Sequence, residues 1–243
     1  MRALVTGGTS GIGLAVARRV VREGGRVVVT GRDGERGAAA ARELGPAGRF
    51  LAADATDVPA AVRSAQEAIG WLGGLDLLVT SAGVALVARL ADTPPDAFDR
   101  LMAVNVRGPL VYAQACLPAL REARGAMVHL GSDAGLRGEQ AIGAYSVSKA
   151  AVAMLSSLLA LDGAPEVRSN CVCPGATRPG MVHIGPPDDP DRGDDPAAWP
   201  VPPTGRVGTG EDVAEAVLYL ARAEHVSGAV LAVDGGGGAG LPG

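Results

Sequence analysis

The sequence predicts a single α/β domain, in which helices cover both faces of a seven-stranded parallel sheet in a doubly wound arrangement. Three observations predict this fold. Short apolar segments alternate along the chain with amphipathic segments of helical length. The run Val27-Val28-Val29 is β-branched throughout, which is typical of a strand buried on both faces. The 243 residues are 47% hydrophobic, which supplies enough apolar surface for one large core.

The order of the elements agrees with this fold. The first strand leads into a helix whose apolar and charged residues separate onto two faces, and Gly24-Gly25 ends that helix. Crossovers between parallel strands are right-handed, which leads to the doubly wound arrangement. We expect strands at residues 2–6, 26–30, 50–53, 75–80, 126–130, 167–172 and 229–233, and helices at 14–23, 35–44, 59–71, 97–120, 144–161 and 212–223.

Two segments of the one domain expected over residues 1–243 lie outside this alternation. Segment 175–205 is rich in proline and carries an acidic run at 188–195. It follows the C-terminal end of a strand, where α/β proteins bind ligands, so we interpret it as a substrate lid. The alternative is a solvated loop without substrate contact. The acidic run has two interpretations of its own: a contact to a cationic substrate, or a solvated acidic loop. Residues 236–243 are rich in glycine and are expected to form a flexible tail.

Charge and cysteine content exclude several classes of protein. A net charge of −4 gives no electrostatic footprint for nucleic acid or an anionic membrane. The N-terminus lacks the apolar stretch of a signal peptide, and no segment reads as an uninterrupted membrane span, so we expect a cytoplasmic protein. Cys171 and Cys173 are expected to be buried thiols on opposite sides of a strand, with Cys116 alone and neither a disulfide nor a metal site.

The turn between the first strand and the first helix carries Gly7, Gly11 and Gly13. Glycine permits a tight turn and a close approach of the backbone to a pyrophosphate. The N-terminus of the following helix offers free N–H groups and the positive end of the helix dipole. Because these glycines lie between a strand and a helix, they indicate a Rossmann-type dinucleotide site.

The end of the second strand bears on the choice of cofactor. A site for NAD(H) places an acidic side chain there to bind the ribose hydroxyls, and that carboxylate repels a 2'-phosphate. Gly31 occupies this place, and Arg32 follows with a guanidinium suited to phosphate. We therefore expect NADP(H), with NAD(H) as the alternative because Asp33 can turn toward the ribose. Asp54, after the third strand, is placed to meet the adenine edge or to cap a helix.

The segment Tyr145-Ser146-Val147-Ser148-Lys149 predicts acid/base chemistry. Residues four apart lie on one face of a helix, so Tyr145 and Lys149 project together. Free tyrosine has a pKa of about 10, and a neighbouring ammonium group lowers this pKa because it favours the phenolate. Ser132 follows a strand and lies where its hydroxyl can hold a substrate oxygen.

The chain resembles the compact single-domain branch of the short-chain dehydrogenase/reductase family over nearly its whole length. The resemblance implies that Tyr145 exchanges the proton at the substrate oxygen and that Lys149 binds the nicotinamide ribose. It also implies that Ser132 orients the substrate and that Asn105 holds a water linked to Lys149; a helix kink or cap is the alternative role for Asn105. The motifs that carry the family resemblance are Thr6-Gly7 with Gly11-Ile12-Gly13, Asn105, Ser132, Tyr145 with Lys149, Pro174-Gly175 and Val233 to Gly236.

The same resemblance implies the remaining cofactor contacts. Three departures from the family pattern put some of them in question: Thr80-Ser81 replaces Asn-Asn, Pro179 replaces threonine, and Gly210 replaces proline. The residues expected to bind the cofactor are Gly7, Thr9, Ser10, Gly11, Ile12, Gly13, Arg32, Asp54, Ala55, Ser81, Ala82, Gly83, Tyr145, Lys149, Pro174, Gly175 and Thr177.

Two rare residue types coincide with these motifs. Lys149 is the only lysine among 22 basic residues, and Asn105 is one of only two asparagines. The chain uses arginine wherever a general positive charge suffices, and a compact ammonium group is not interchangeable with a guanidinium. This favours a specific chemical role for Lys149.

These features predict an NADPH-dependent carbonyl reductase that is reversible as a secondary-alcohol dehydrogenase. A dinucleotide-binding regulator without turnover and a redox-coupled epimerase are the alternatives. The family resemblance also implies a homo-oligomer, a tetramer or a dimer, that packs through helices 97–120 and 144–161. The substrate pocket is expected to draw on Asp133, Gln140, Met181, His183 and Trp199.

Overall fold

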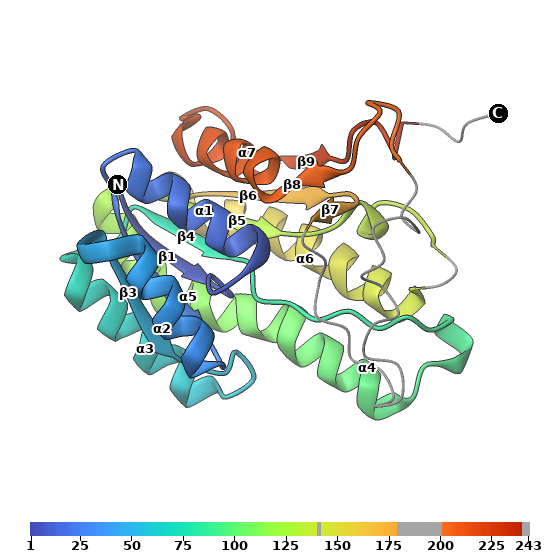
Figure 1. Ribbon diagram of the computed structural model, residues 1–243, viewed down its shortest axis with the longest axis horizontal. Coiled ribbons are helices and arrows are strands. Elements are labelled where there is room, and N and C mark those ends of the chain that lie inside the picture. The colour runs from blue at the N-terminus through green and yellow to red at the C-terminus, as the bar shows by residue number, and fades with distance from the viewer. Residues whose placement is uncertain (140–141, 179–200, 240–243) are drawn as a thin grey trace.

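The computed structural model describes residues 1–139, 142–178 and 201–239, and its architecture confirms the predicted fold class. Seven parallel strands form one sheet in the order β3-β2-β1-β4-β5-β6-β9 (Figure 1). Every predicted strand is present, and the differences lie only at strand ends. The strands are β1 Arg2–Thr6, β2 Arg26–Gly31, β3 Gly48–Ala52, β4 Leu77–Thr80, β5 Ala126–Leu130, β6 Arg168–Pro174 and β9 Val230–Val233.

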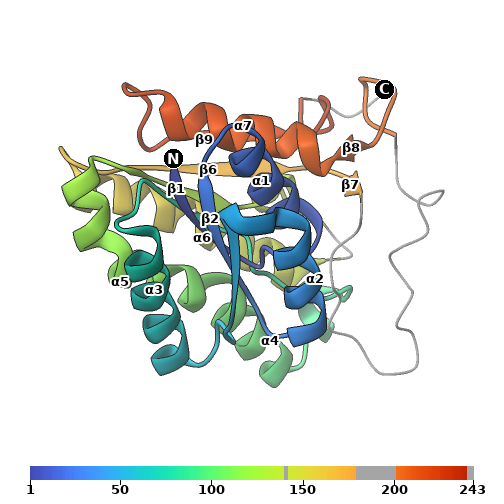
Figure 2. The same cartoon turned by 60° about the vertical axis from the view of Figure 1, so that its left-hand side comes forward.

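Helices cover both faces of this sheet (Figure 2). On one face lie α1 Gly11–Arg22, α2 Gly34–Leu44 and α7 Gly210–Arg222; on the other lie α3 Val58–Leu72, α5 Gly108–Ala123 and α6 Gly143–Gly163. Successive strand residues face opposite layers, so Ala3 and Val5 pack under α1 and α7, whereas Leu4 packs toward α3 and α5. Short 3₁₀ turns occur at η1 Gly45–Ala47, η2 Leu90–Asp92 and η4 Asp133–Gly135.

Small residues allow α7 to pack closely on α1. A Cβ atom at Gly210 would lie 2.9 Å from the Cβ of Ala15, so a larger residue there would push the two helices apart. The N-terminus of α7 is fixed by a capping box, in which Thr209 and Asp212 bond each other's backbone N–H groups. Gly210, which replaces the family's proline, therefore allows the close packing of α7 on α1.

The helix predicted at 97–120 is not one regular helix. It consists of α4 Pro95–Met102, a π-helical turn η3 at Ala103–Arg107, and α5. Pro109 has no amide hydrogen, so it cannot donate the usual bond to the carbonyl of Asn105 four residues earlier. Gly108 N–H instead bonds the carbonyl of Ala103, five residues earlier. The π-turn widens the helix at Asn105.

Helix α6 corrects the expectation that no segment is of membrane-spanning length. By length and composition alone it is long and apolar enough to cross a membrane. In the structure, 44% of its most apolar 18-residue stretch is buried, and its inner face packs on β6. Its outer face exposes Val147, Met154, Leu158 and Leu161. A helix with two apolar faces is typical of a helix that other protein surfaces cover on both of those faces.

The segment predicted as a lid lies mostly outside the described residues, but both of its ends are fixed. Strand β7, Thr177–Arg178, pairs in parallel with β8, Gly208–Thr209. The predicted tail is held by hydrogen bonds as far as Ala239, because Asp234 accepts from the backbone of Gly236 and Gly238. Residues 240–243 lie outside the described residues.

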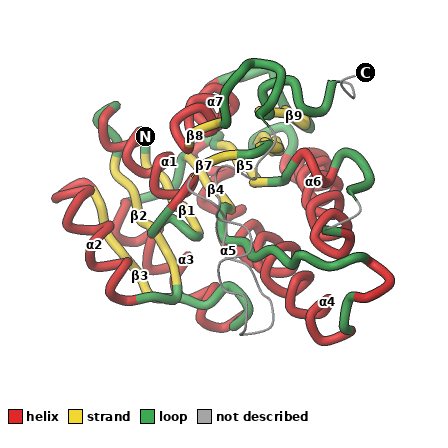
Figure 3. Tube along the Cα trace, turned by 45° about the vertical axis from the view of Figure 1, so that its right-hand side comes forward, coloured by secondary structure: helices red, strands yellow, loops and turns green. Residues whose placement is uncertain are grey.

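The topology fixes where a ligand can bind. Strands β2 and β3 lie on one side of β1, and the chain then crosses to β4 on the other side, so the strand order reverses between β1 and β4. The carboxyl ends of β1, β4 and β5 open at the same edge of the sheet (Figure 3). In doubly wound sheets, that edge at the reversal point is the usual ligand crevice.

We predict opposite effects of one substitution at two helical glycines. The Cβ in Gly37→Ala would overlap the ring of Phe50, whereas the Cβ in Gly70→Ala would meet nothing within 4 Å. We expect Gly37→Ala to lower the free energy of unfolding by about 1–3 kcal/mol through overpacking. Gly70→Ala should raise it by about 0.5–1 kcal/mol, because alanine loses less entropy in a helix. Urea denaturation measures both changes. An unchanged free energy of unfolding in Gly37→Ala would contradict the packing described.

Candidate active site

The structure brings Asn105, Ser132, Tyr145 and Lys149 together at the carboxyl edge of the sheet. Tyr145 and Lys149 lie one turn apart on α6, Ser132 follows β5, and Asn105 lies in the π-turn η3. Hydrogen bonds link these elements directly: Tyr145 to Ser132, Lys149 to the end of β5, and Asn105 to α6.

Tyr145 is buried with its hydroxyl hydrogen-bonded to Ser132. Burial raises the pKa of Tyr145 to about 12; the bond from Ser132 opposes this rise, and the charge of Asp133 adds to it. The predicted lowering of this pKa by Lys149 was therefore wrong: burial has the largest effect, and it raises the pKa of Tyr145. The phenol is therefore protonated at neutral pH and is able to act as an acid.

Lys149 is almost completely buried, and its Nζ donates to the carbonyl oxygen of Leu130 at 2.8 Å. Burial lowers its pKa from 10.5 to about 8, while the nearby thiols of Cys171 and Cys173 act in the opposite direction. Its Nζ lies 5.7 Å from the centre of the Tyr145 ring. At neutral pH, Lys149 is thus mostly a buried cation beside the tyrosine.

The side chain of Asn105 makes three hydrogen bonds. Its Oδ1 accepts from the backbone N–H of Val84 at 2.9 Å, and its Nδ2 donates to the carbonyl of Val84 and to the hydroxyl of Ser148. Ser148 in turn donates to the carbonyl of Tyr145 at 2.7 Å. Asn105 therefore joins the loop after β4 to the helix that carries Tyr145.

Ser132 has two further partners. It caps the turn η4, where its Oγ accepts from the backbone N–H of Ala134. Its hydroxyl also lies 3.2 Å from the carboxylate of Asp133, which pairs with Arg137 at 3.3 Å. The serine hydroxyl is thus held beside Tyr145 by its own turn.

The two cysteines of β6 lie on the same side of the strand, so the expectation of opposite sides was wrong. Side chains of a strand alternate with a period of two, and residues 171 and 173 are two apart. Their Sγ atoms are 3.8 Å apart and face Gly131, where a Cβ would lie 2.7 and 2.8 Å from them. Both thiols are free and buried below Lys149.

The glycine-rich turn has the geometry of an anion cradle. Gly7 has φ +64°, and a Cβ there would lie 2.6 Å from the backbone of Ala82. Gly11 has φ +53°, and a Cβ there would meet nothing within 4 Å. Helix α1 begins at Gly11 with no side-chain cap from Ser10 and no acidic residue in its first turn. Its first N–H groups therefore have no side-chain acceptor and are available to an anion such as a phosphate.

The end of β2 disfavours an acidic cofactor contact. A Cβ at Gly31 would lie 3.0 Å from Thr9, so a larger side chain is excluded there without movement. Asp33 caps α2: it accepts from the backbone of Glu35 and Arg36 and pairs with the Arg36 side chain. The carboxylate of Asp33 is thus already engaged in capping α2, which disfavours the alternative contact from Asp33 to a ribose.

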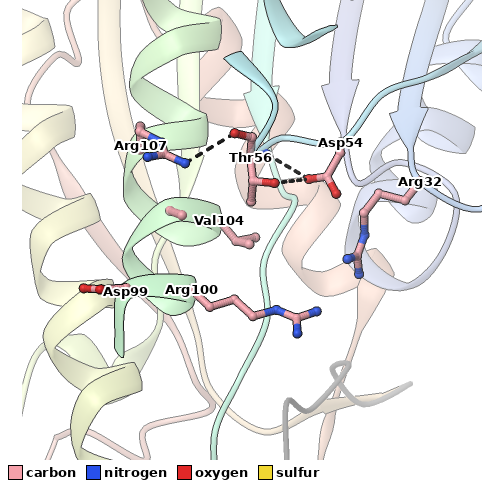
Figure 4. Close-up of a pocket in the computed structure, with 8 residues that line it drawn as sticks. Arg32, Asp54, Thr56, Asp99, Arg100, Val104 and Arg107 are labelled. Atoms are coloured by element: carbon pink, nitrogen blue, oxygen red, sulfur yellow. Dashed lines mark hydrogen bonds between the residues drawn. The ribbon is translucent and has the colours of Figure 1, made fainter. Parts of the chain in front are cut away.

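Arg32 opens onto a cavity of about 480 Å³ beside the adenine end of the expected site (Figure 4). Asp54 lies in its wall, and its Oδ1 accepts from both the backbone N–H and the hydroxyl of Thr56 at 2.8 Å. Burial favours a higher pKa for Asp54, but these bonds and the charges of Arg32 and Arg100 leave its pKa below the ordinary value. The helix-cap role belongs to Asp57. Residues lining the cavity are Arg32, Asp54, Thr56, Asp99, Arg100, Ala103, Val104 and Arg107.

The segment after β4 is held by its backbone. The N–H of Ser81 bonds the carbonyl of Thr6 at 3.2 Å, and that of Ala82 bonds the Thr6 hydroxyl at 3.3 Å. Thr80, which replaces the family's asparagine, lies 2.8 Å from Nδ1 of the buried His129. Burial lowers the pKa of His129 to about 4, so this imidazole is neutral.

The segment after β6 begins at the same edge. Gly175 bonds the carbonyl of Val233 at 3.1 Å, and Thr177 Oγ1 donates to the carbonyl of Gly175 at 2.9 Å. A Cβ at Gly175 would lie 2.8 Å from Asp234. Of the predicted substrate contacts, Asp133 is described; Gln140, Met181, His183, Trp199 and the departure at Pro179 lie outside the described residues.

Sequence reasoning missed three partners in this network: Val84, Leu130 and Ser148. Ser148 lies three residues after Tyr145, so its helical spacing was a usable signal. Val84 and Leu130 act through backbone atoms, for which the residue type carries no signal.

Comparisons with known proteins agree with this geometry. A family model described as enoyl-(acyl carrier protein) reductase matches residues 7–237. The 2-(S)-hydroxypropyl-CoM dehydrogenase 3 of Xanthobacter autotrophicus is 39% identical over 96% of this chain and 94% of its own length. The NADP-dependent (R)-specific alcohol dehydrogenase of Lentilactobacillus kefiri is 33% identical over 96% of this chain and 95% of its own. A solved structure described as a short chain dehydrogenase/reductase family protein is 37% identical, with a TM-score of 0.84 over 98% of this chain and 97% of its own.

We predict that Lys149 makes stability depend on pH. Its pKa falls from 10.5 to about 8 on folding, so between these values the unfolded chain binds more protons and stability rises with pH. Lys149→Met removes this dependence. Relative to the variant, the unmodified protein should gain roughly 3 kcal/mol in free energy of unfolding from pH 8 to pH 10.5. Urea denaturation across this range measures the difference, and a constant difference would rule out a buried ammonium group.

Proposed function

This chain belongs to the short-chain dehydrogenase/reductase family, and we propose that it is an NADP(H)-dependent carbonyl reductase, reversible as a secondary-alcohol dehydrogenase. The observation that carries the proposal is the connected set of Tyr145, Ser132, Lys149 and Asn105. The substrate is a small carbonyl compound or alcohol, and neither nucleic acid nor a membrane is a partner.

The proton chemistry follows from the state of Tyr145. With a pKa of about 12 it is protonated at neutral pH, so it donates its proton to the carbonyl oxygen during reduction. Ser132, bonded to the same hydroxyl, is placed to bind the same substrate oxygen. Lys149 supplies a positive charge 5.7 Å from the centre of the tyrosine ring and would donate hydrogen bonds to the nicotinamide ribose. When bound, the nicotinamide supplies the hydride to the carbonyl carbon or accepts it from the alcohol.

Two features support the cofactor. The open first turn of α1 and the glycines before it fit the pyrophosphate, together with Thr9, Ser10, Ile12 and Gly13. We assign Asp54, Ala55 and the segment Ser81–Gly83 to the adenosine, and Pro174, Gly175 and Thr177 to the nicotinamide; Asp54 supports this because it lies in the wall of the cavity beside Arg32.

The preference for the phosphorylated cofactor rests on the end of β2. Gly31 leaves no acid beside the ribose, Asp33 is engaged in capping α2, and Arg32 faces the cavity. A relative that is named NADP-dependent supports the same choice. A guanidinium binds a 2'-phosphate through charge-assisted bonds.

We also propose a cytoplasmic homo-oligomer, a tetramer or a dimer, that buries the outer face of α6. Val147, Met154, Leu158 and Leu161 form an exposed apolar stripe there. Covering such a stripe with a second copy removes apolar surface from water. Light scattering should give a multiple of the 24.3 kDa chain mass, and a monomer at micromolar concentration would contradict this assembly.

We predict oxidation of NADPH with at least one ketone or aldehyde from a panel, several-fold faster than oxidation of NADH. Absorbance of the reduced cofactor measures both rates. Equal or faster rates with NADH would refute the cofactor preference. Turnover of substrate without net loss of NADPH would favour the epimerase, and cofactor binding without turnover would favour the regulator.

In the same assay, Tyr145→Phe should lose at least about a hundredfold in kcat, because the proton donor is removed. Its affinity for NADPH should be nearly unchanged. Tyr219→Phe is the matched control, since Tyr219 is exposed on α7, and it should keep full activity. A Tyr145→Phe enzyme that retains turnover would remove Tyr145 from the role of acid.

A further inference from the structure

The cavity beside β2 contains two arginines that come from distant parts of the chain. Arg32 follows β2, and Arg100 lies on α4. Both guanidinium groups point into the same space (Figure 4). Within residues 1–139, 142–178 and 201–239, neither guanidinium makes a hydrogen bond or an ion pair, although the charges of both act on Asp54. Their N–H donors are therefore available to a ligand.

The other charged groups of the cavity do not occupy these donors. Arg107 donates to the carbonyl of Thr56 at 3.3 Å. The carboxylate of Asp99 points away from the two guanidinium groups, as Figure 4 shows. Asp54 is held by Thr56 through Oδ1. Three arginines face only two carboxylates among the lining residues, so the cavity has an excess of positive charge.

Two guanidinium groups that face one another repel, and a dianion between them converts this repulsion into attraction. A phosphate monoester provides two negative charges and three acceptor oxygens, which match the planar forks of two arginines. An uncharged ring placed there would leave the repulsion in place. Charge therefore favours a phosphate over the adenine base as the partner of Arg100.

We propose that Arg100 joins Arg32 in binding the 2'-phosphate of NADP(H), so that the two arginines form a clamp across the cavity. The inference rests on the proposed function and adds a second specificity-determining residue, from α4, to that site. Asp54, whose pKa the charges of both arginines lower, remains available to accept from the adenine amino group. The preference for NADP(H) then depends on two elements of the fold rather than on β2 alone.

Calorimetric titration with two small ligands tests this inference directly. Adenosine 2',5'-bisphosphate and adenosine 5'-monophosphate differ only in the 2'-phosphate. We expect Arg100→Gln to weaken binding of the bisphosphate by about tenfold or more and to leave binding of the monophosphate unchanged. Arg100→Lys, which keeps the charge but loses the fork, should lie between the two. Arg63→Gln, on the exposed face of α3, is the control and should bind both ligands as the unmodified protein does.

The outcomes separate this inference from the function it rests on. If Arg100→Gln weakens the binding of both ligands equally, Arg100 contacts the part common to them and the clamp is refuted. If the variant weakens neither ligand while the unmodified protein prefers the bisphosphate, the clamp is refuted and the cofactor proposal stands. If the unmodified protein shows no preference for the bisphosphate, both are overturned. Thermal unfolding of each variant verifies that it is folded.

Discussion

The candidate site depends on one buried amide, that of Asn105. Its three hydrogen bonds hold the loop after β4 to the π-turn and the π-turn to α6. The loop carries the expected adenosine contacts, and α6 carries Tyr145 and Lys149. A buried amide with unsatisfied groups is costly, so the network is stable only with all its partners in place. The geometry at both ends of the expected cofactor thus rests on the same side chain.

The charged residues divide into two populations with different energetics. Arginines pair with carboxylates on the outside, as Arg19 does with Glu23 and Glu211, where each pair contributes little. The only lysine is instead buried under the sheet edge, where its charge lowers stability. A cation retained at such a cost is typical of a functional site.

Sequence patterns were sufficient for the sheet, because fully apolar strands and glycine turns are local signals. They were insufficient wherever a distant residue decides the outcome. The bonds of Asn105 to Val84 depend on the fold, and the raised pKa of Tyr145 depends on burial, which a sequence does not display. Arg100 was overlooked for the same reason, since only the fold places it opposite Arg32. The break in the helix at 97–120 instead follows from Pro109, a local signal that the prediction overlooked. The error over Cys171 and Cys173 was likewise local, because strand periodicity alone puts both on one side.

The short ladder between β7 and β8 has an evolutionary consequence. It closes the chain between Arg178 and Gly208 into a loop whose ends are fixed independently of what lies between them. The entropy of closing a loop grows only logarithmically, so doubling its length costs only about 0.6 kcal/mol. A change in the length of this segment therefore costs little free energy and need not disturb the hydrogen bonds of Asn105 and Lys149. Relatives that share this fold can in this way differ in the segment between β7 and β8 and still keep the same arrangement of the sheet edge.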